Sequence, residues 1–325
     1  MKKTIDCFTF FNELDLLEIR LKYLYPVVDY FVIVESDTSF NGKNKELIFK
    51  KNKGKFKDYS DKIIYLSIKM KSFFDSGLNS EEAAWEREKY QRNCINDGLR
   101  TLNLEQDDLI LISDIDEIPN KDVLQSIQSD NYENVELQQK NSLSIIVKTL
   151  SYFLKTVFYK LINSSNYKYR YRLKFMYYIL IKRYKPPVSF KMVINYYYIN
   201  YQKTDEIWHG LQCVTPEWLN IFTIDEIRSF RRIPVKSINC GWHFSYLGGK
   251  EMIIYKIKNF SHQEFNIKEI LSNEYIDYCI ENGYCLFDYY LNPKKTKRQF
   301  NTINVNHFPK DLQKILTEYK NLIKT

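Results

Sequence analysis

The sequence predicts an α/β fold with a mostly parallel central sheet and helices on its faces. Strand-like and helix-like segments alternate over the first 120 residues of the 325-residue chain. The strand-like segments are apolar throughout, which is typical of strands buried on both faces of a parallel sheet. A hydrophobic content of 44% is sufficient for a large core.

Four strands are expected in this first part, at residues 4–11, 30–34, 63–66 and 109–113. Leucines at helical spacing follow the first of them: Leu14, Leu17, Leu21 and Leu24. Asn12 precedes these leucines and can cap the helix that they predict. A second helix is expected from Ser80, its cap, to about Leu99. Glu81 and Glu82 lie in its first turn, where acidic side chains favour the helix dipole.

The later part of the chain is less regular. Residues Val193–Tyr201 alternate enough to predict a strand that returns to the core. Two segments that contain histidine, GWHFSYLGG at 241–249 and NFSHQEFN at 259–266, are expected among strand-like and helical pieces. Pro309 suits the first turn of a terminal helix that ends near Ile323.

Charge is distributed unevenly along the chain. The formal net charge is +8, yet no acidic residue lies between Glu136 and Asp205, a gap that holds 13 Lys and Arg residues. The remainder of the chain therefore carries −5. The sequence describes a mildly acidic protein with one strongly basic, tyrosine-rich segment.

Six cysteines are present without any CxxC spacing, so we expect reduced thiols rather than a zinc site. The opening MKKTIDCFTFFNEL contains Asp6, Asn12 and Glu13 and lacks a long apolar core, which predicts a first strand and not a signal peptide. No run of about 18 apolar residues is present, so no membrane-spanning helix is expected. The expected location is the cytoplasm, either free or bound peripherally at the inner face of a membrane.

The stretch DDLILISDIDEIPN, residues 107–120, ends an apolar run with three carboxylates, those of Asp114, Asp116 and Glu117. Like charges at this spacing repel, so a positive partner is expected nearby. Mg²⁺ and Mn²⁺ commonly bind through one or two carboxylates together with substrate phosphates. The alternative is an acidic loop that caps the following helix. The position directly after a buried strand favours the metal site.

Polar residues follow two other predicted strands as well, at Asn12–Glu13 and at Glu35–Asp37. Carboxyl ends of neighbouring parallel strands meet at one edge of the sheet, and ligands of such sheets bind there. We therefore expect these residues and the three carboxylates to form a single polar rim.

Four blocks in this order resemble glycosyltransferase family 17: residues 11–36, AWEREKYQRNCI (84–95), DDLILISDIDEIP (107–119) and GWHFSYLGG (241–249). The resemblance is close over residues 4–120 and looser over about 200–290. It implies a GT-A-like nucleotide-sugar-binding fold and an inverting, metal-dependent transferase. The expected donor substrate is UDP-GlcNAc or a related UDP-sugar, and the expected acceptor is a glycan or a lipid-linked glycan.

The resemblance also implies roles for residues of the metal site. Asp114 and Asp116 correspond to the DxD pair, in which Asp116 binds Mn²⁺ or Mg²⁺ and Asp114 contacts the ribose or reaches the metal through water. Glu117 would orient these ligands. His243 lies where many GT-A folds supply a histidine to the metal or the diphosphate. Its alternative is a core histidine that packs beside Trp242 and Phe244.

Other candidates concern the donor substrate. Arg87 and Gln91, four residues apart on the expected second helix, are candidates to reach it, whereas Glu88 and Arg92 are explained by a salt bridge. Three residues are candidates to bind the uracil and ribose: Asn12, Glu13 and Glu35. Their alternative roles are a helix cap for Asn12, a solvated turn for Glu13 and a strand-end charge for Glu35.

Inversion needs a general base that takes a proton from the acceptor hydroxyl. Glu251 and Glu264 are the candidates that the resemblance suggests. Either could instead pair with nearby lysines, and His262 could be a structural partner of Glu264.

Three parts are expected: a nucleotide-sugar-binding half at 1–136, a basic amphipathic insertion at 137–191, and an acceptor-side half with terminal helices at 192–325. An apolar stripe runs from Ile146 to Leu161, and YKYRYRLKFMYYILIKRYK follows at 167–185. One interpretation of 145–185 is docking to an anionic membrane surface. The other is a helical subdomain that packs on the catalytic domain.

Two other functions compete with a glycosyltransferase. Interleaved Tyr and Lys or Arg could bind a nucleic acid or another anionic polymer, although the acidic rim would repel phosphate without a metal. A metal-dependent phosphohydrolase is the third hypothesis, because metals bound by carboxylates serve both reactions.

Overall fold

The structure is a computed structural model that describes residues 2–70, 80–131, 137–139, 167–232, 236–294 and 297–325. Its strands are β1 (Thr4–Phe10), β2 (Tyr30–Ser36), β3 (Ile63–Ile68), β4 (Leu109–Asp114), β5 (Glu117–Ile118), β6 (Leu137–Gln139), β7 (Val188–Tyr196), β8 (Tyr201–Val214), β9 (Lys236–Ser245) and β10 (Phe300–Thr302). Its α-helices are α1 (Leu14–Leu24), α2 (Ile48–Asn52), α3 (Ser80–Asn93), α4 (Ile95–Leu99), α5 (Lys121–Gln128), α7 (Tyr167–Leu180), α8 (Ile224–Arg228), α9 (Gly249–Asn259), α10 (Asn273–Asn282), α11 (Leu286–Leu291) and α12 (Lys310–Leu316).

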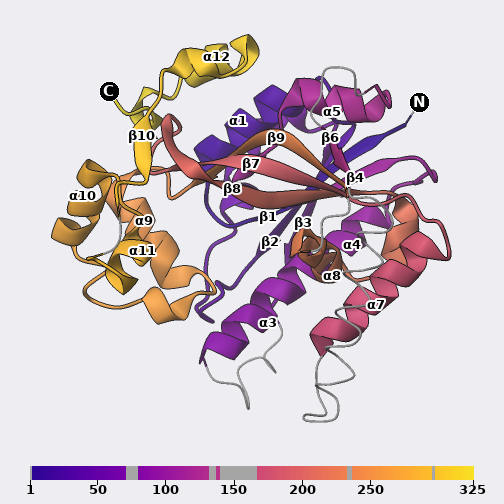
Figure 1. The fold of residues 1–325 in the computed structure, drawn as a ribbon, viewed down its shortest axis with the longest axis horizontal. Helices are drawn as coiled ribbons and strands as arrows, with labels where there is room; N and C mark the ends of the chain where they lie inside the picture. Colours follow the sequence, from indigo (N-terminus) through magenta and orange to yellow (C-terminus); the bar gives the residue numbers. More distant parts are fainter. Residues whose placement is uncertain (1, 71–79, 132–136, 140–166, 233–235, 295–296) are drawn as a thin grey trace.

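One sheet runs through the described part of the chain in the order β3-β2-β1-β4-β8-β7-β9-β5, with β10 paired to β8 and β6 to β9 (Figure 1). The strands β3, β2, β1 and β4 are parallel. β8 then joins antiparallel to β4 and β7, while β7 and β9 are parallel. The predicted α/β class is confirmed, and the sheet is parallel in its first half and mixed beyond β4.

The four expected strands of the first part are confirmed, each within a few residues of its predicted bounds. The expected helix from 80 to 99 is divided into α3 and α4 at Cys94. The expected strand Val193–Tyr201 was placed too late: β7 covers 188–196, a turn follows, and Tyr201 begins β8. Asn12 was wrong as a helix cap, because Glu13 is at the N-cap position and no side chain caps α1.

Helices cover both faces of the sheet and pack on its apolar side chains (Figure 1). Residues of α1, α5 and α12 join one core cluster on the sheet. Residues of α4, α7 and α8 join a second cluster with the alternate side chains of β1, β2 and β4. A third cluster, formed by α9, α10 and α11, packs on the ends of β7 and β8. The strand ends between these clusters remain free to line a site.

The described part of the basic segment packs on this core. In α7, Phe175 and Met176 are buried, and the Phe175 ring lies 4.4 Å from that of Phe230 and 5.3 Å from that of Trp218. Ile181 is 66% exposed just beyond the helix. These contacts favour the helical-subdomain interpretation for α7, whereas the stripe at 146–161 lies outside the described residues. Within the described residues, no helix is both long enough and apolar enough to cross a bilayer.

Gly241 allows β9 to approach the turn after Asp116. Its φ is +89°, and a Cβ at this position would lie 2.2 Å from the Ile118 carbonyl oxygen. This approach pairs Glu117 with His243 across β5 and β9.

We expect Gly241→Ala to lower the free energy of unfolding by about 1–3 kcal/mol or more, because alanine is strained at positive φ and would collide with backbone. Gly54→Ala is the matched control, since nothing lies within 4 Å of a Cβ there. Urea denaturation of both variants measures the difference, and equal stability of the two would contradict this role.

Candidate active site

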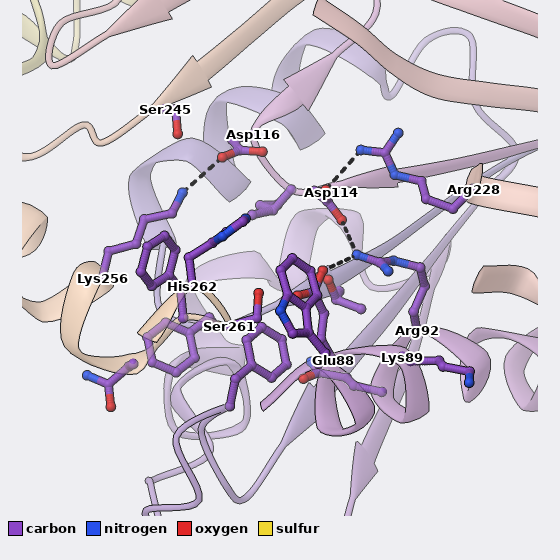
Figure 2. A pocket seen from close by; sticks show the side chains of 18 of the residues that line it. Glu88, Lys89, Arg92, Asp114, Asp116, Arg228, Ser245, Lys256, Ser261 and His262 are labelled. Atoms are coloured by element: carbon purple, nitrogen blue, oxygen red, sulfur yellow. Dashed lines mark hydrogen bonds and ion pairs between the residues drawn. The ribbon is translucent and has the colours of Figure 1, made fainter. Parts of the chain in front are cut away.

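A cavity of about 620 Å³ opens at the carboxyl ends of β1 and β4 (Figure 2). It is lined from the first half of the chain by Thr9, Phe10, Phe11, Glu13, Phe40, Trp85, Glu86, Glu88, Lys89, Gln91, Arg92, Asp114, Ile115 and Asp116. From the second half it is lined by Tyr196, Trp208, Asp225, Arg228, Ser229, Arg231, His243, Ser245, Tyr246, Lys256, Asn259, Phe260, Ser261, His262, Phe265 and Phe287. Of the expected polar rim, Glu13, Asp114 and Asp116 line this cavity, which lies between segments that are distant in sequence.

Asp114, the last residue of β4, is clamped by two arginines. One carboxylate oxygen lies 2.9 Å from Arg228 of α8, and the other lies 3.4 Å from Arg92 of α3. Burial by itself would raise the pKa of Asp114, but the charges of Arg228 and Arg92 outweigh it and hold that pKa well below its ordinary value. Asp114 is therefore ionised at neutral pH and already paired.

Asp116 lies two residues on and faces a different pair of side chains. Its Oδ2 accepts a hydrogen bond from Lys256 Nζ at 2.9 Å, and its Oδ1 lies 3.6 Å from His243 Nε2. Burial opposes ionisation, yet Lys256 and then His243 lower the pKa of Asp116 far below its ordinary value. Figure 2 shows Lys256 and Arg228 reaching the two aspartates from opposite sides.

Glu117 is fully buried and orients its neighbours. Its Oε1 accepts from Trp208 Nε1 at 2.6 Å and from Arg228, and its Oε2 accepts from the Asp114 backbone N–H at 3.2 Å. Both oxygens are thus used within the protein. This geometry agrees with an orienting role for Glu117 and leaves it without a free oxygen for a metal.

The positive partner that the carboxylates require is therefore present in the chain itself. Arg228 and Lys256 were not among the candidates from sequence, because more than 110 residues separate each of them from its partner. The expected salt bridge between Glu88 and Arg92 is confirmed, and Arg92 additionally binds Asp225 at 2.6 Å. The alternative of an acidic helix-capping loop is wrong, because Asn120 caps α5.

His243 is placed beside Asp116, as the resemblance implies. Its ring stacks on that of Trp208 at 4.6 Å between centroids and 14° between planes. Its Nδ1 is buried and has no hydrogen-bond partner among the described residues. His243 therefore packs against an aromatic ring and also presents Nε2 to the aspartate.

Arg20 holds the backbone at Asp114 and Ile115 in place. It is fully buried, forms a two-point ion pair with Asp6 at 2.6 and 2.8 Å, and donates to the carbonyls of Asp114 and Ile115 at 2.9 and 3.0 Å. It also donates to Ser113 Oγ at 2.7 Å. The sequence contains a signal for this ion pair, since Arg20 interrupts the apolar stripe of α1 and Asp6 interrupts an apolar strand.

The residues after the first two strands separate into two groups. Glu13 lines the cavity, and its Oε2 accepts from the backbone N–H groups of Phe11 and Asn12. Asn12 and Glu35 do not line it. Glu35 is fully buried and accepts hydrogen bonds from four donors: Lys45 Nζ, Tyr65 Oη and the backbone N–H groups of Ile48 and Phe49. Binding of a nucleotide by Glu35 stays a prediction, and this geometry does not support it.

Arg87 and Gln91 are both buried on α3. Gln91 lines the cavity and donates to the carbonyls of Val34 at 2.9 Å and Phe10 at 3.4 Å, so it ties the ends of β1 and β2 together. Arg87 donates to the Phe40 carbonyl at 2.8 Å and does not line the cavity. Arg87 therefore supports the loop after β2 from behind.

Neither candidate base lines the cavity. Glu251 is exposed in the first turn of α9. Glu264 lies 2.7 Å from His262 Nδ1, which agrees with the expected pairing, and it is His262 that lines the cavity. The role of either glutamate as a base stays a prediction without geometric support.

Comparison with known proteins identifies a family that the first part of the chain matches. Residues 1–145 match the model of glycosyltransferase family 17. Over 125 residues the chain is 32% identical to the beta-1,4-mannosyl-glycoprotein 4-beta-N-acetylglucosaminyltransferases of Rattus norvegicus and Homo sapiens, and 31% identical to that of Mus musculus. Each match covers 37% of this chain and 22% of the relative, so the chain spans about a fifth of the length of the curated relatives it matches. The resemblance to glycosyltransferase family 17 is thus confirmed over residues 1–145, which contain three of the four blocks.

Proposed function

We propose that the protein transfers a sugar, GlcNAc being the first candidate, from a UDP-sugar to a glycan or lipid-linked glycan, with inversion at the sugar carbon. The observation that carries this proposal is the position of Asp114 and Asp116 in a cavity at the carboxyl ends of parallel strands. Ligands of open α/β sheets bind at such strand ends. The match to family 17 and the names of the relatives support a GlcNAc donor substrate.

In this reaction the acceptor hydroxyl oxygen attacks the anomeric carbon, the bond to the diphosphate oxygen breaks, and UDP departs. The acceptor proton passes to a base. Negative charge grows on the leaving diphosphate, so cations fixed beforehand around it lower the barrier. Lys256 and the arginines beside Asp114 supply such fixed charges on both sides of the aspartates.

A divalent cation fits part of the site. Asp116 Oδ1 and His243 Nε2 are 3.6 Å apart and can contact one ion, whose remaining ligands would be phosphate oxygens and water. Asp114 and Glu117 fit less well: arginines engage the Asp114 oxygens, and Arg228, Trp208 and the Asp114 backbone N–H engage those of Glu117. Among the described residues no group of three or more His, Cys, Asp or Glu side chains is arranged for a metal. When bound, Mn²⁺ or Mg²⁺ would act as a Lewis acid on the diphosphate.

No specific observation favours either competing hypothesis, the polymer-binding protein or the phosphohydrolase. Among the side chains of α7 that the structure describes, Phe175 and Met176 are buried in the core and Tyr177 is exposed. A phosphohydrolase shares the carboxylates, and inorganic phosphate release from phosphoesters separates it from a transferase.

Calorimetry with the wild-type protein tests the proposal. We expect UDP and UDP-GlcNAc to bind more tightly with Mn²⁺ than with EDTA, and GDP and CMP to bind weakly. A folded protein that binds neither UDP nor any UDP-sugar would contradict a UDP-dependent transferase. Phosphate release without sugar transfer would favour the phosphohydrolase.

A further inference from the structure

Arg231 is a cavity-lining cation for which the described residues provide no carboxylate partner. It lies in the 3-10 helix Ser229–Arg232 that directly follows α8. Its guanidinium carbon lies 5.1 Å from the centre of the Trp208 ring. No carboxylate of the described residues comes within 4.0 Å of it. Its planar fork of five N–H donors is therefore available to a ligand.

The other cations that line the cavity are all paired. Arg92 contacts Glu88, Asp114 and Asp225; Arg228 contacts Asp114 and Glu117; Lys256 contacts Asp116; Lys89 contacts Glu86. Asp114 and Glu117, whose charges act on Arg231, are thus already in direct contact with other cations. Arg231 itself has no carboxylate in direct contact among the described residues.

The electrostatics of Arg231 agree with this view. Burial, and next the charge of Arg228, lower the pKa of Arg231 to about 10, although Glu117 and Asp114 act in the opposite direction. The side chain remains charged at neutral pH. A largely desolvated charge without a counter-ion is costly, and an anionic ligand would remove that cost.

Arg231 is also connected to Asp116 through two stacked rings, those of Trp208 and His243. Trp208, against which it lies, stacks on His243, and His243 Nε2 is 3.6 Å from Asp116 Oδ1. An arginine fork matches phosphate oxygens in two-point contacts, which a lysine cannot reproduce.

We propose that Arg231 binds a phosphate group of the substrate and that this phosphate belongs to the diphosphate of the UDP-sugar. The inference rests on the proposed function. In that reaction Arg231 neutralises charge on the departing UDP. A phosphate carried by the acceptor is the alternative source of the same chemistry.

The test titrates wild type, Arg231→Gln and Arg231→Lys with UDP, uridine and inorganic pyrophosphate, each with Mn²⁺ and with EDTA. We expect Arg231→Gln to lose about 10- to 100-fold in affinity for UDP and pyrophosphate, as for loss of charged hydrogen bonds, and to keep its affinity for uridine. Arg231→Lys should lie in between, because it retains the charge without the fork. Arg100→Gln is the matched control, since Arg100 is 72% exposed and outside the cavity.

The outcomes separate this inference from the proposed function. Unchanged affinity for UDP and pyrophosphate in a folded Arg231→Gln, or in Arg231→Lys if the glutamine variant does not fold, overturns the inference. Wild type that binds pyrophosphate through Arg231 but no uridine nucleotide supports the phosphate contact and contradicts the proposed function. A phosphate-bearing glycolipid is titrated in the same way, and a loss of affinity in Arg231→Gln that is confined to this glycolipid overturns the assignment to the UDP-sugar.

Discussion

Asp116→Asn is expected to reduce the kcat/KM for UDP-GlcNAc by about 100-fold or more, equivalent to about 2.7 kcal/mol of transition-state stabilisation. The amide cannot replace the carboxylate that faces His243 Nε2 and Lys256 Nζ. Any contribution of a divalent cation should be lost with it, so that Mn²⁺ and EDTA give the same UDP affinity. Steady-state kinetics and calorimetry measure the two effects.

The same variant separates two roles of Asp116. If the carboxylate serves only as counter-charge to Lys256, its removal frees that lysine, and UDP should bind as well as before or more tightly without metal. That result would contradict metal binding at Asp116. Asp97→Asn is the matched control, because Asp97 is 62% exposed and pairs only with the exposed Arg100 among the described residues.

Arg20→Met is expected to lower the free energy of unfolding by about 3–5 kcal/mol, because it leaves Asp6 buried without its charge partner. The carbonyls of Asp114 and Ile115 lose their donors in the same change. Urea denaturation measures the loss. The aspartate turn should also loosen, so that the fraction that remains folded binds UDP more weakly.

Two further variants make this result specific. Adding Asp6→Val to Arg20→Met removes the uncompensated carboxylate and should recover part of the lost stability. Arg100→Met should change stability by no more than about 0.5 kcal/mol, as is usual for exposed positions. A loss below about 1 kcal/mol in Arg20→Met would contradict its role as the support of the site.

The predictions from sequence succeeded where neighbouring residues determine the structure. Apolar runs located β1 to β4, and the break after Leu109–Ser113 located the carboxylates at the mouth of the cavity. Parallel strand ends converge by geometry, which is why Glu13 and Asp114 could be placed together before their contacts were known.

The charges that balance the site were not predicted, for a physical reason. Arg228 and Lys256 reach the aspartates, and Arg231 reaches the cavity, only because β8, β7 and β9 extend the first-half sheet and carry α8 and α9 to its end. Such contacts span more than 110 residues and leave no local pattern. Glu251 shows the opposite case. It closely follows the family-like block GWHFSYLGG in the sequence, yet it lies on the exposed side of its helix and outside the cavity.

The central claim is that the UDP-sugar binds in this cavity, and photolabelling with 5-azido-UDP-GlcNAc tests it most directly. Peptide mapping should find the label in cavity-lining segments, within residues 9–13, at Phe40 or within residues 85–92, and excess UDP should prevent it. Label concentrated in residues 167–185, or spread over the surface and insensitive to UDP, would contradict the claim and return attention to the basic segment.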